Sequence, residues 1–162
     1  MHTAQQLLPG VNWFDLPDPA SSDLDELARR FHLHELQIED CRHRPQRAKV
    51  DEYGAYLFAV LKHMVRREQG SAFDDFDTFL GPDFLITVHQ GDCPFLAKLC
   101  ARVQQNHVVR LDRILYEFTD LIVDEYLACW TNRPMTFRRS NRLCCNIRSP
   151  RCYVRFSTSN AA

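Results

Sequence analysis

The 162-residue sequence has no run of roughly 18–20 consecutive apolar residues, the length that a membrane-spanning helix needs. It also lacks a basic excess, since its formal net charge is −1, and this argues against nucleic acid as a partner. The first residues contain neither a basic segment nor an apolar core, so we expect no signal peptide. We therefore expect a cytoplasmic chain that makes no direct contact with a membrane.

Several catalytic and metal-binding motifs are absent as well. The seven cysteines form no C-x-x-C pair, and without a signal peptide they are expected to be reduced thiols rather than a disulfide framework. There is no Gly-rich phosphate loop and no G-x-S-x-G elbow. His32, His34 and Glu35 are zinc-ligand types, but Ile38 stands where an H-E-x-x-H motif needs its second histidine. We predict that the protein is not an enzyme, with a metal-dependent enzyme that uses His34 as the alternative.

Charge divides the chain into two parts. Residues 128–162 contain seven arginines and no acidic residue, a charge of +7 that leaves −8 for residues 1–127. An acidic body suits a positively charged partner such as a cation. Apolar periodicity stops abruptly near residue 127, and arginine outnumbers lysine 17 to 3 in the whole chain. We interpret residues 1–127 as a partial domain and residues 128–162 as a disordered tail, produced by a frameshift that truncates the protein.

Periodicity predicts an α/β fold, in which helices pack on a mixed, mainly antiparallel sheet and a last helix leads toward a stalk. Three neighbouring strands are expected to form an antiparallel meander, because consecutive strands usually pair. Ser21 to Asp23 has the chemistry of a helix N-cap, and Asp112 can cap the last helix. The expected strands are residues 13–16, 53–65, 73–80 and 84–89, the turns are 69–71 and 81–83, and the helices are 21–31, 34–41, 94–107 and 112–127.

Three stretches resemble the CorA magnesium and cobalt transporter family. Residues 13–16 (WFDL), 34–40 (HELQIED) and 46–53 (QRAKVDEY) are similar to its W-I-D-L, H-P-L-x-x-E-D and Q-R-P-K-V-x-x-Y. Residues 79–89 (FLGPDFLITVH) are similar to F-L-G-x-x-x-L-(I/V)-T-V-H, and residues 115–126 (LYEFTDLIVDEY) to L-Y-x-L-(I/L)-D-x-(I/L)-V-D-x-Y. The motifs occur in the family's order and spacing.

The sequence also departs from the family pattern. Glu35 and Ala48 stand where the family favours proline, and few residues precede Trp13, where the family has further strands. The stalk helix, the two transmembrane helices and the Gly-Met-Asn pore motif have no counterpart in this sequence. The resemblance thus implies the cytoplasmic, magnesium-sensing portion of a CorA-type transporter, unable to conduct ions alone.

The resemblance also implies a regulatory metal site. Asp40 matches the family's position between subunits, and Glu39 and Asp120 match the adjoining second site. Carboxylates are the ligands that Mg²⁺ prefers, and it commonly uses only one or two of them. The implied ligand is Mg²⁺, with Co²⁺ as a second candidate, and the implied partners are the other subunits of a homopentamer at the cytoplasmic face of the membrane.

Other interpretations remain open from the residues alone. Glu39, Asp40 and the acidic positions Glu117, Asp120 and Asp124 are also what the solvated faces of amphipathic helices normally carry. The chain could then be a soluble α/β binding or interaction module without a role in transport. A non-functional gene fragment is the remaining alternative.

Overall fold

The computed structural model describes residues 5–8, 10–67, 70–106 and 110–131. Internal contacts divide the chain into residues 1–132 and residues 133–162, and the second unit lies outside the described part. The prediction of a disordered tail from residue 128 therefore falls mostly outside it too, although the last helix continues to Thr131. Among the helices of the described residues, none is long and apolar enough to cross a membrane.

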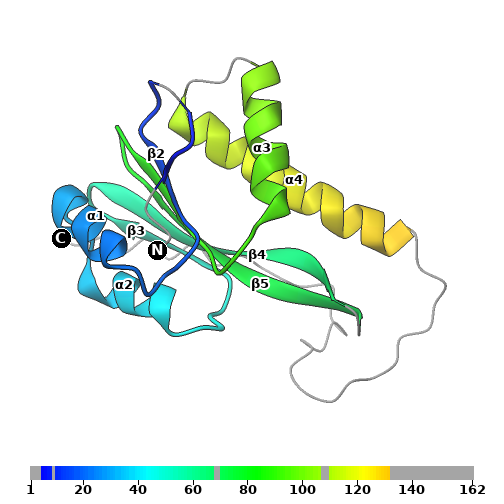
Figure 1. Cartoon of the computed structure of the whole chain (residues 1–162), viewed down its shortest axis with the longest axis horizontal. Helices are drawn as coiled ribbons and strands as arrows, with labels where there is room; N and C mark the ends of the chain where they lie inside the picture. Colours follow the sequence, from blue (N-terminus) through cyan, green and yellow to red (C-terminus); the bar gives the residue numbers. More distant parts are fainter. Residues whose placement is uncertain (1–4, 9, 68–69, 107–109, 132–162) are drawn as a thin grey trace, which may run out of the picture. The chain divides into compact units, whose positions relative to one another are not determined.

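Among the described residues, six strands form one sheet in the order β1-β2-β6-β5-β4-β3. Figure 1 labels β2, β3, β4 and β5 of this sheet. β2 pairs with β6 in parallel, and every other neighbouring pair is antiparallel. The predicted mixed, mainly antiparallel sheet is therefore confirmed, and β4, β5 and β6 form the expected meander. The strands are β1 Gln5–Gln6, β2 Trp13–Leu16, β3 Lys49–Tyr53, β4 Tyr56–Arg67, β5 Gly70–Leu80 and β6 Leu85–Val88.

The strand predicted over residues 53–65 is wrong at its start. A hairpin stands there instead, in which β3 pairs with β4 around a turn at Gly54 and Ala55. Gly54 has a φ of +48°, a conformation that glycine adopts without steric cost. β3 was missed because its sequence, KVDEY, is mostly polar and partly exposed, as suits an edge strand. In the turn predicted at 69–71, Gln69 lies outside the described residues and Gly70 already belongs to β5.

In the part of the chain that the structure describes, four helices accompany the sheet. Ser21 caps the first helix as predicted, since its side-chain oxygen accepts a hydrogen bond from the Asp23 N–H at 3.2 Å. The last helix begins one residue before Asp112, so this residue lies in the first turn rather than at the cap. An acidic residue there still interacts favourably with the helix dipole. The helices are α1 Ser22–Phe31, α2 Glu35–Arg42, α3 Pro94–Gln105 and α4 Leu111–Thr131.

Alternating side chains of the strands build two separate cores. On one face, Phe58, Phe79 and Ile86 pack against the buried side chains of α1 and α2. On the other face, Trp13 and Phe76 pack against the buried side chains of α3 and α4. Burying each such side chain stabilises the fold by roughly 1.5–3 kcal/mol. The helix pairs α1–α2 and α3–α4 thus cover opposite faces of the sheet, as Figure 1 shows.

Candidate functional site

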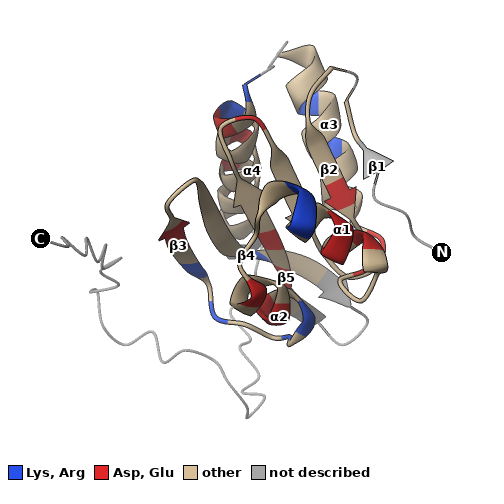
Figure 2. Cartoon of the chain, turned by 90° about the vertical axis from the view of Figure 1, so that its left-hand side faces the viewer, with Lys and Arg blue, Asp and Glu red and all other residues tan. Residues whose placement is uncertain are grey.

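Asp40 lies on α2 and faces a lysine of the edge strand. Its Oδ2 accepts a hydrogen bond from Lys49 Nζ at 2.6 Å, and the same ammonium lies 3.0 Å from Asp51 Oδ2. All three side chains are partly exposed, with relative exposures of 27% for Asp40, 34% for Lys49 and 41% for Asp51. Figure 2 shows acidic positions on α2 and β3 beside a basic position at the start of β3. A carboxylate predicted to bind a cation therefore already holds one from its own chain.

The pKa of Lys49 is raised above its ordinary value. Partial burial of the ammonium lowers this pKa and is the largest single cause, but the hydrogen bonds and negative charges of Asp40 and Asp51 together raise it by more. Both bonds favour the charged form, so Lys49 remains a cation throughout the physiological range. Ion pairs this exposed contribute only about 0–1 kcal/mol to stability, which makes the contact easy to exchange.

Glu39 is the most exposed of the predicted metal ligands. Its side chain is 62% exposed and lies 3.8 Å from His43 Nδ1, measured from Glu39 Oε1. The same ring nitrogen lies 3.1 Å from the Glu39 carbonyl oxygen, so His43 covers the end of α2. The Glu39 carboxylate is therefore accessible to a ligand outside the domain.

Asp120, predicted to share the site, lies on α4 and hence on the opposite face of the sheet from Asp40. It contacts Arg102 of α3, whose NH2 donates to Asp120 Oδ2 at 2.5 Å. Arg102 also lies 2.7 Å from Glu117 and 3.8 Å from Asp124. The structure therefore does not bring Asp40 and Asp120 together within one chain.

The acidic side chains of α4 surround the Arg102 guanidinium and do not form a fully solvated face. Glu117 is buried, and besides Arg102 it has a second partner in Arg113, at 3.0 Å. The hydrogen bond to Asp120 is the main cause that raises the pKa of Arg102. The sequence showed the acidic spacing but not its partner, because Arg102 comes from another helix.

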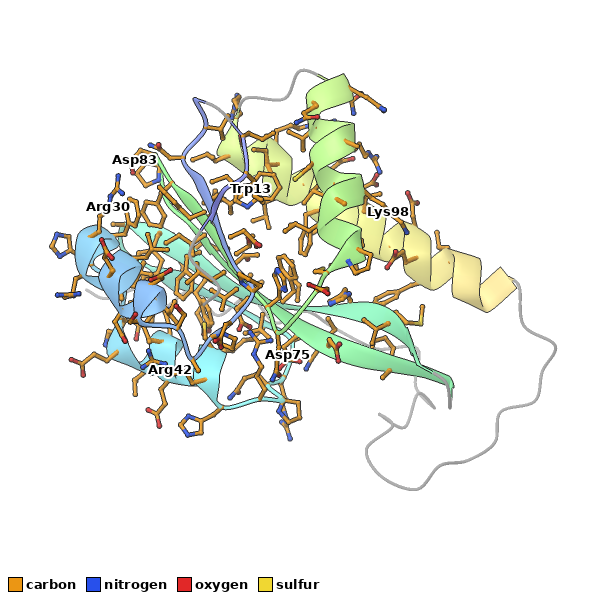
Figure 3. All side chains as sticks on the ribbon, in the orientation of Figure 1. Trp13, Arg30, Arg42, Asp75, Asp83 and Lys98 are labelled. Atoms are coloured by element: carbon orange, nitrogen blue, oxygen red, sulfur yellow. The ribbon has the colours of Figure 1, made fainter. Side chains whose placement is uncertain are left out.

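A second ionic cluster, missed in the sequence, anchors the loop after α2. The Arg44 guanidinium donates to Asp77 Oδ2 and to the Asp75 carbonyl oxygen, both at 2.6 Å, and to the Val88 carbonyl at 3.2 Å. Its Nε donates to the Cys41 carbonyl at 2.9 Å. Lys62 pairs with the Asp75 carboxylate, and Asp75 is labelled in Figure 3. One side chain thus ties the end of α2 to β5 and β6.

Asp77 is the most buried member of this cluster, with a side-chain exposure of 1%. Burial raises the pKa of Asp77 to about 6, although the neighbouring Arg44 lowers it. A carboxylate taken out of water favours its neutral form unless a cation compensates. Arg44 is therefore the residue that keeps Asp77 ionised near neutral pH.

His89 directly follows β6 and is part of a buried polar chain. Its Nε2 lies 3.2 Å from Asp15 Oδ2, and its ring stacks on Phe76. Thr87 donates to Asp15 Oδ1 at 2.5 Å and accepts from the Trp13 indole N–H at 3.2 Å. Trp13, labelled in Figure 3, is fully buried. These bonds join β2 to β6, the parallel pair of the sheet.

His34 serves α2 as its N-cap. Its Nδ1 accepts from the Leu36 N–H at 3.2 Å, and its ring packs against Tyr53 at a centroid distance of 4.8 Å. Across the part of the chain that the structure describes, no three His, Cys, Asp or Glu side chains are grouped so that they could hold a metal ion. The alternative of a zinc enzyme that uses His34 therefore gains no support from the geometry.

The donors at Asp40 fit Mg²⁺ by type and accessibility. They are hard carboxylate oxygens at a partly exposed surface, and Mg²⁺ keeps several waters and needs few protein ligands. A site at Asp40 would have to be completed by water or by another chain. Lys49 must also move, because its ammonium occupies the space that a bound cation would take.

Comparison with known proteins identifies relatives of this domain. A family model described as CorA-like Mg²⁺ transporter protein matches residues 9–132. YfjQ of Bacillus subtilis (strain 168), assigned as a metal ion transporter, is 31% identical over 134 residues, or 81% of this chain and 40% of YfjQ. C17A12.14 of Schizosaccharomyces pombe (strain 972), assigned likewise, is 26% identical over 123 residues, or 72% of this chain and 20% of its own length. The chain thus spans less than half the length of these relatives.

Solved structures share the fold. The CorA magnesium transporter of Methanocaldococcus jannaschii matches with a TM-score of 0.61 at 15% identity, over 74% of this chain and 39% of its own. The full-length CmaX protein matches with a TM-score of 0.64 at 14% identity, over 78% and 40%. The ZntB cytoplasmic domain of Vibrio parahaemolyticus matches with a TM-score of 0.58 at 12% identity, over 72% and 50%. The predicted fold, similar to the CorA soluble domain, is confirmed.

Proposed function

The chain belongs to the CorA-like Mg²⁺ transporter family, and from this premise we propose that its domain is the cytoplasmic magnesium-sensing part of a divalent-cation transporter. The transported ion in this proposal is Mg²⁺, with Co²⁺ as a second candidate, and the sensing ligands are Asp40, Glu39 and Asp120. The observation that carries the proposal is the Asp40 carboxylate, which lies partly exposed beside the sheet edge and already binds a cationic group.

The placement of the ligands on opposite faces of the sheet supports a site shared between chains. One chain cannot bring Asp40 and Asp120 to the same ion, because α2 and α4 lie on different faces. A ring of identical subunits with head-to-tail contacts places one face of each copy against the opposite face of the next. In the proposed homopentamer, Asp40 of one copy would then meet Asp120 of its neighbour.

The proposed sensing mechanism is linkage between ion binding and assembly. Acidic groups that face each other across a subunit boundary repel, even where an internal cation neutralises part of their charge, until a further cation binds between them. Mg²⁺ that binds only to the packed arrangement stabilises it, and a fall in cytosolic Mg²⁺ releases it. The residues of this chain supply the carboxylates and hold them in place. Ion conduction lies outside the proposal for this domain.

Thermal unfolding in a magnesium titration tests the proposal. At constant ionic strength, we expect MgCl₂ at about ten times its dissociation constant to raise the melting temperature of the chain by roughly 3–6 °C. Asp40→Asn should abolish most of the rise, and Asp40→Asn combined with Asp120→Asn should abolish all of it. Asn keeps the size of the side chain but removes the charge that attracts the ion.

A matched control is available on α1. Asp25 is an exposed carboxylate that pairs with Arg42 at 2.8 Å, so Asp25→Asn also removes one surface charge and one ion pair. This variant should respond to Mg²⁺ as the unmodified chain does. The proposal fails if Mg²⁺ at millimolar concentration changes nothing, or if Asp40→Asn responds as fully as Asp25→Asn does.

The alternative of an interaction module has one observation in its favour. Tyr116, Val123 and Leu127 of α4 are more than half exposed, with relative exposures of 52%, 51% and 58%. An apolar stripe of this kind can bind another protein chain. In the transporter proposal the same stripe faces a neighbouring subunit, so the magnesium titration separates the two functions.

A further inference from the structure

Two cationic side chains form ion pairs with carboxylates that the proposed function assigns to Mg²⁺. Lys49 lies between Asp40 and Asp51, and Arg102 lies among Glu117, Asp120 and Asp124. Each side chain comes from a different element than the ligand it covers, β3 for Asp40 and α3 for Asp120. An ion that binds at either place competes with a charge that belongs to the chain itself.

The two internal cations differ in how firmly they are held. Arg102 contacts three carboxylates, and one of them, Glu117, is only 3% exposed. A planar guanidinium with several charge-assisted bonds is a strong and specific contact. Arg102 therefore joins α3 to α4 as part of the fold and stays in place, so Asp120, which is 37% exposed, would contact an ion while still paired with Arg102.

The Lys49 ammonium is more easily replaced by another cation. Lys49 forms ion pairs with only two carboxylates, its side chain is 34% exposed, and β3 is an edge strand of the sheet. Its ammonium also lies 5.4 Å from the centre of the Phe58 ring, at the distance of a cation–π contact. A flexible stem lets the ammonium swing into water while the backbone of β3 stays paired with β4.

We propose that Lys49 is a tethered competitor of the divalent cation at Asp40 and sets the concentration at which Mg²⁺ binds. With Lys49 in place, one of the two negative charges of Asp40 and Asp51 is neutralised, and the ammonium repels a divalent ion from the space between the two carboxylates. When Mg²⁺ is abundant, it displaces the ammonium and receives both carboxylates. The inference deepens the proposed function and depends on Asp40 as a ligand.

Charge removal at Lys49 tests the inference. Lys49→Gln removes the competing charge and keeps a polar stem, so the midpoint of the Mg²⁺ titration should fall on the order of tenfold, given the repulsion between a unit charge and a nearby divalent ion. Lys49→Arg keeps the charge and should leave the midpoint within about twofold of the unmodified chain. Melting temperature against MgCl₂ concentration, at constant ionic strength, gives each midpoint.

A lysine on the other side of the sheet provides the control. Lys98 of α3 pairs with Glu125 at 3.2 Å and is 65% exposed, so Lys98→Gln removes the same charge far from Asp40 in the fold. Its midpoint should be unchanged. Circular dichroism of each variant without Mg²⁺ shows whether the fold is kept, and Lys49→Met is a second neutral variant that keeps the apolar stem.

The outcomes separate the inference from the proposed function. The inference is overturned if the unmodified chain responds through Asp40 but neither neutral Lys49 variant lowers the midpoint. If only the neutral variants respond, and Asp40→Asn abolishes that response, the competitor role holds while sensing by the native chain is refuted. If neither the native chain nor the neutral variants respond, both are refuted.

Discussion

Replacement of Arg44 by Met should destabilise the domain strongly near neutral pH and weakly in mild acid. Met keeps much of the apolar stem but removes all four hydrogen bonds of the guanidinium, one of which reaches the Asp77 carboxylate at 2.6 Å. Asp77 would be left as a buried charge without its cation. Breaking a buried pair in this way costs about 3–5 kcal/mol.

The pH dependence follows from the pKa of Asp77. Burial raises this pKa to about 6 in the folded chain, above the ordinary value of 3.8, so the folded state binds the proton more tightly than the unfolded state does. The contribution of Asp77 to stability therefore rises as pH falls through about 6. Because Arg44 lowers the pKa of Asp77, its removal makes protonation easier still. At pH 5 the penalty of Arg44→Met should shrink to about 1–2 kcal/mol, the cost of the lost hydrogen bonds.

Urea unfolding followed by circular dichroism at pH 7.5 and pH 5 measures both values. Arg42→Met is the matched control, because Arg42 pairs with an exposed Asp25 and should cost no more than about 1 kcal/mol at either pH. In the double variant Arg44→Met with Asp77→Asn, the difference between the two pH values should largely disappear. A penalty below about 1 kcal/mol at pH 7.5, or an equal penalty at both pH values, would refute the reasoning.

Two further predictions concern packing and thiol chemistry. Gly81→Ala should destabilise the domain by about 1–3 kcal/mol in urea unfolding, because the added Cβ would lie 2.2 Å from the Phe84 ring. The double variant Gly81→Ala with Phe84→Leu should recover part of that loss. A Gly81→Ala variant as stable as the unmodified chain would contradict the geometry. Burial raises the pKa of the Cys93 thiol to about 11, so iodoacetamide at pH 8 should modify it at least about 100-fold more slowly than in urea. Mass spectrometry of the peptides measures both rates, and equal rates would contradict the effect of the partial burial of Cys93 on its thiol.

Elements that are encoded by neighbouring residues could be predicted well from the sequence. Ser21 predicted the start of α1, and the apolar run at residues 84–89 predicted β6, because caps and strands are encoded by neighbouring residues. β3 could not be predicted this way. Its polar residues are held by pairing with β4 rather than by an apolar pattern of their own.

For the candidate site, the sequence could indicate only which residue types to consider. The acids at positions 40 and 120 could be selected from the sequence, but their partners come from elsewhere in the fold. Lys49 is nine residues from Asp40 on another element, and Arg102 is 18 residues from Asp120. The buried pair Arg44–Asp77 spans 33 residues. No periodicity reports such pairs, because they exist only after the sheet has brought its helices into place.

The binding position of the ion tests the central claim most directly. Amide correlation spectra of the ¹⁵N-labelled chain, recorded during a MgCl₂ titration at constant ionic strength, report which residues sense the ion. We predict saturable shifts at Glu39, Asp40 and Lys49 that are lost in Asp40→Asn. Shifts confined to other surfaces, or shifts of the same size in the Asp40→Asn variant, would contradict the account.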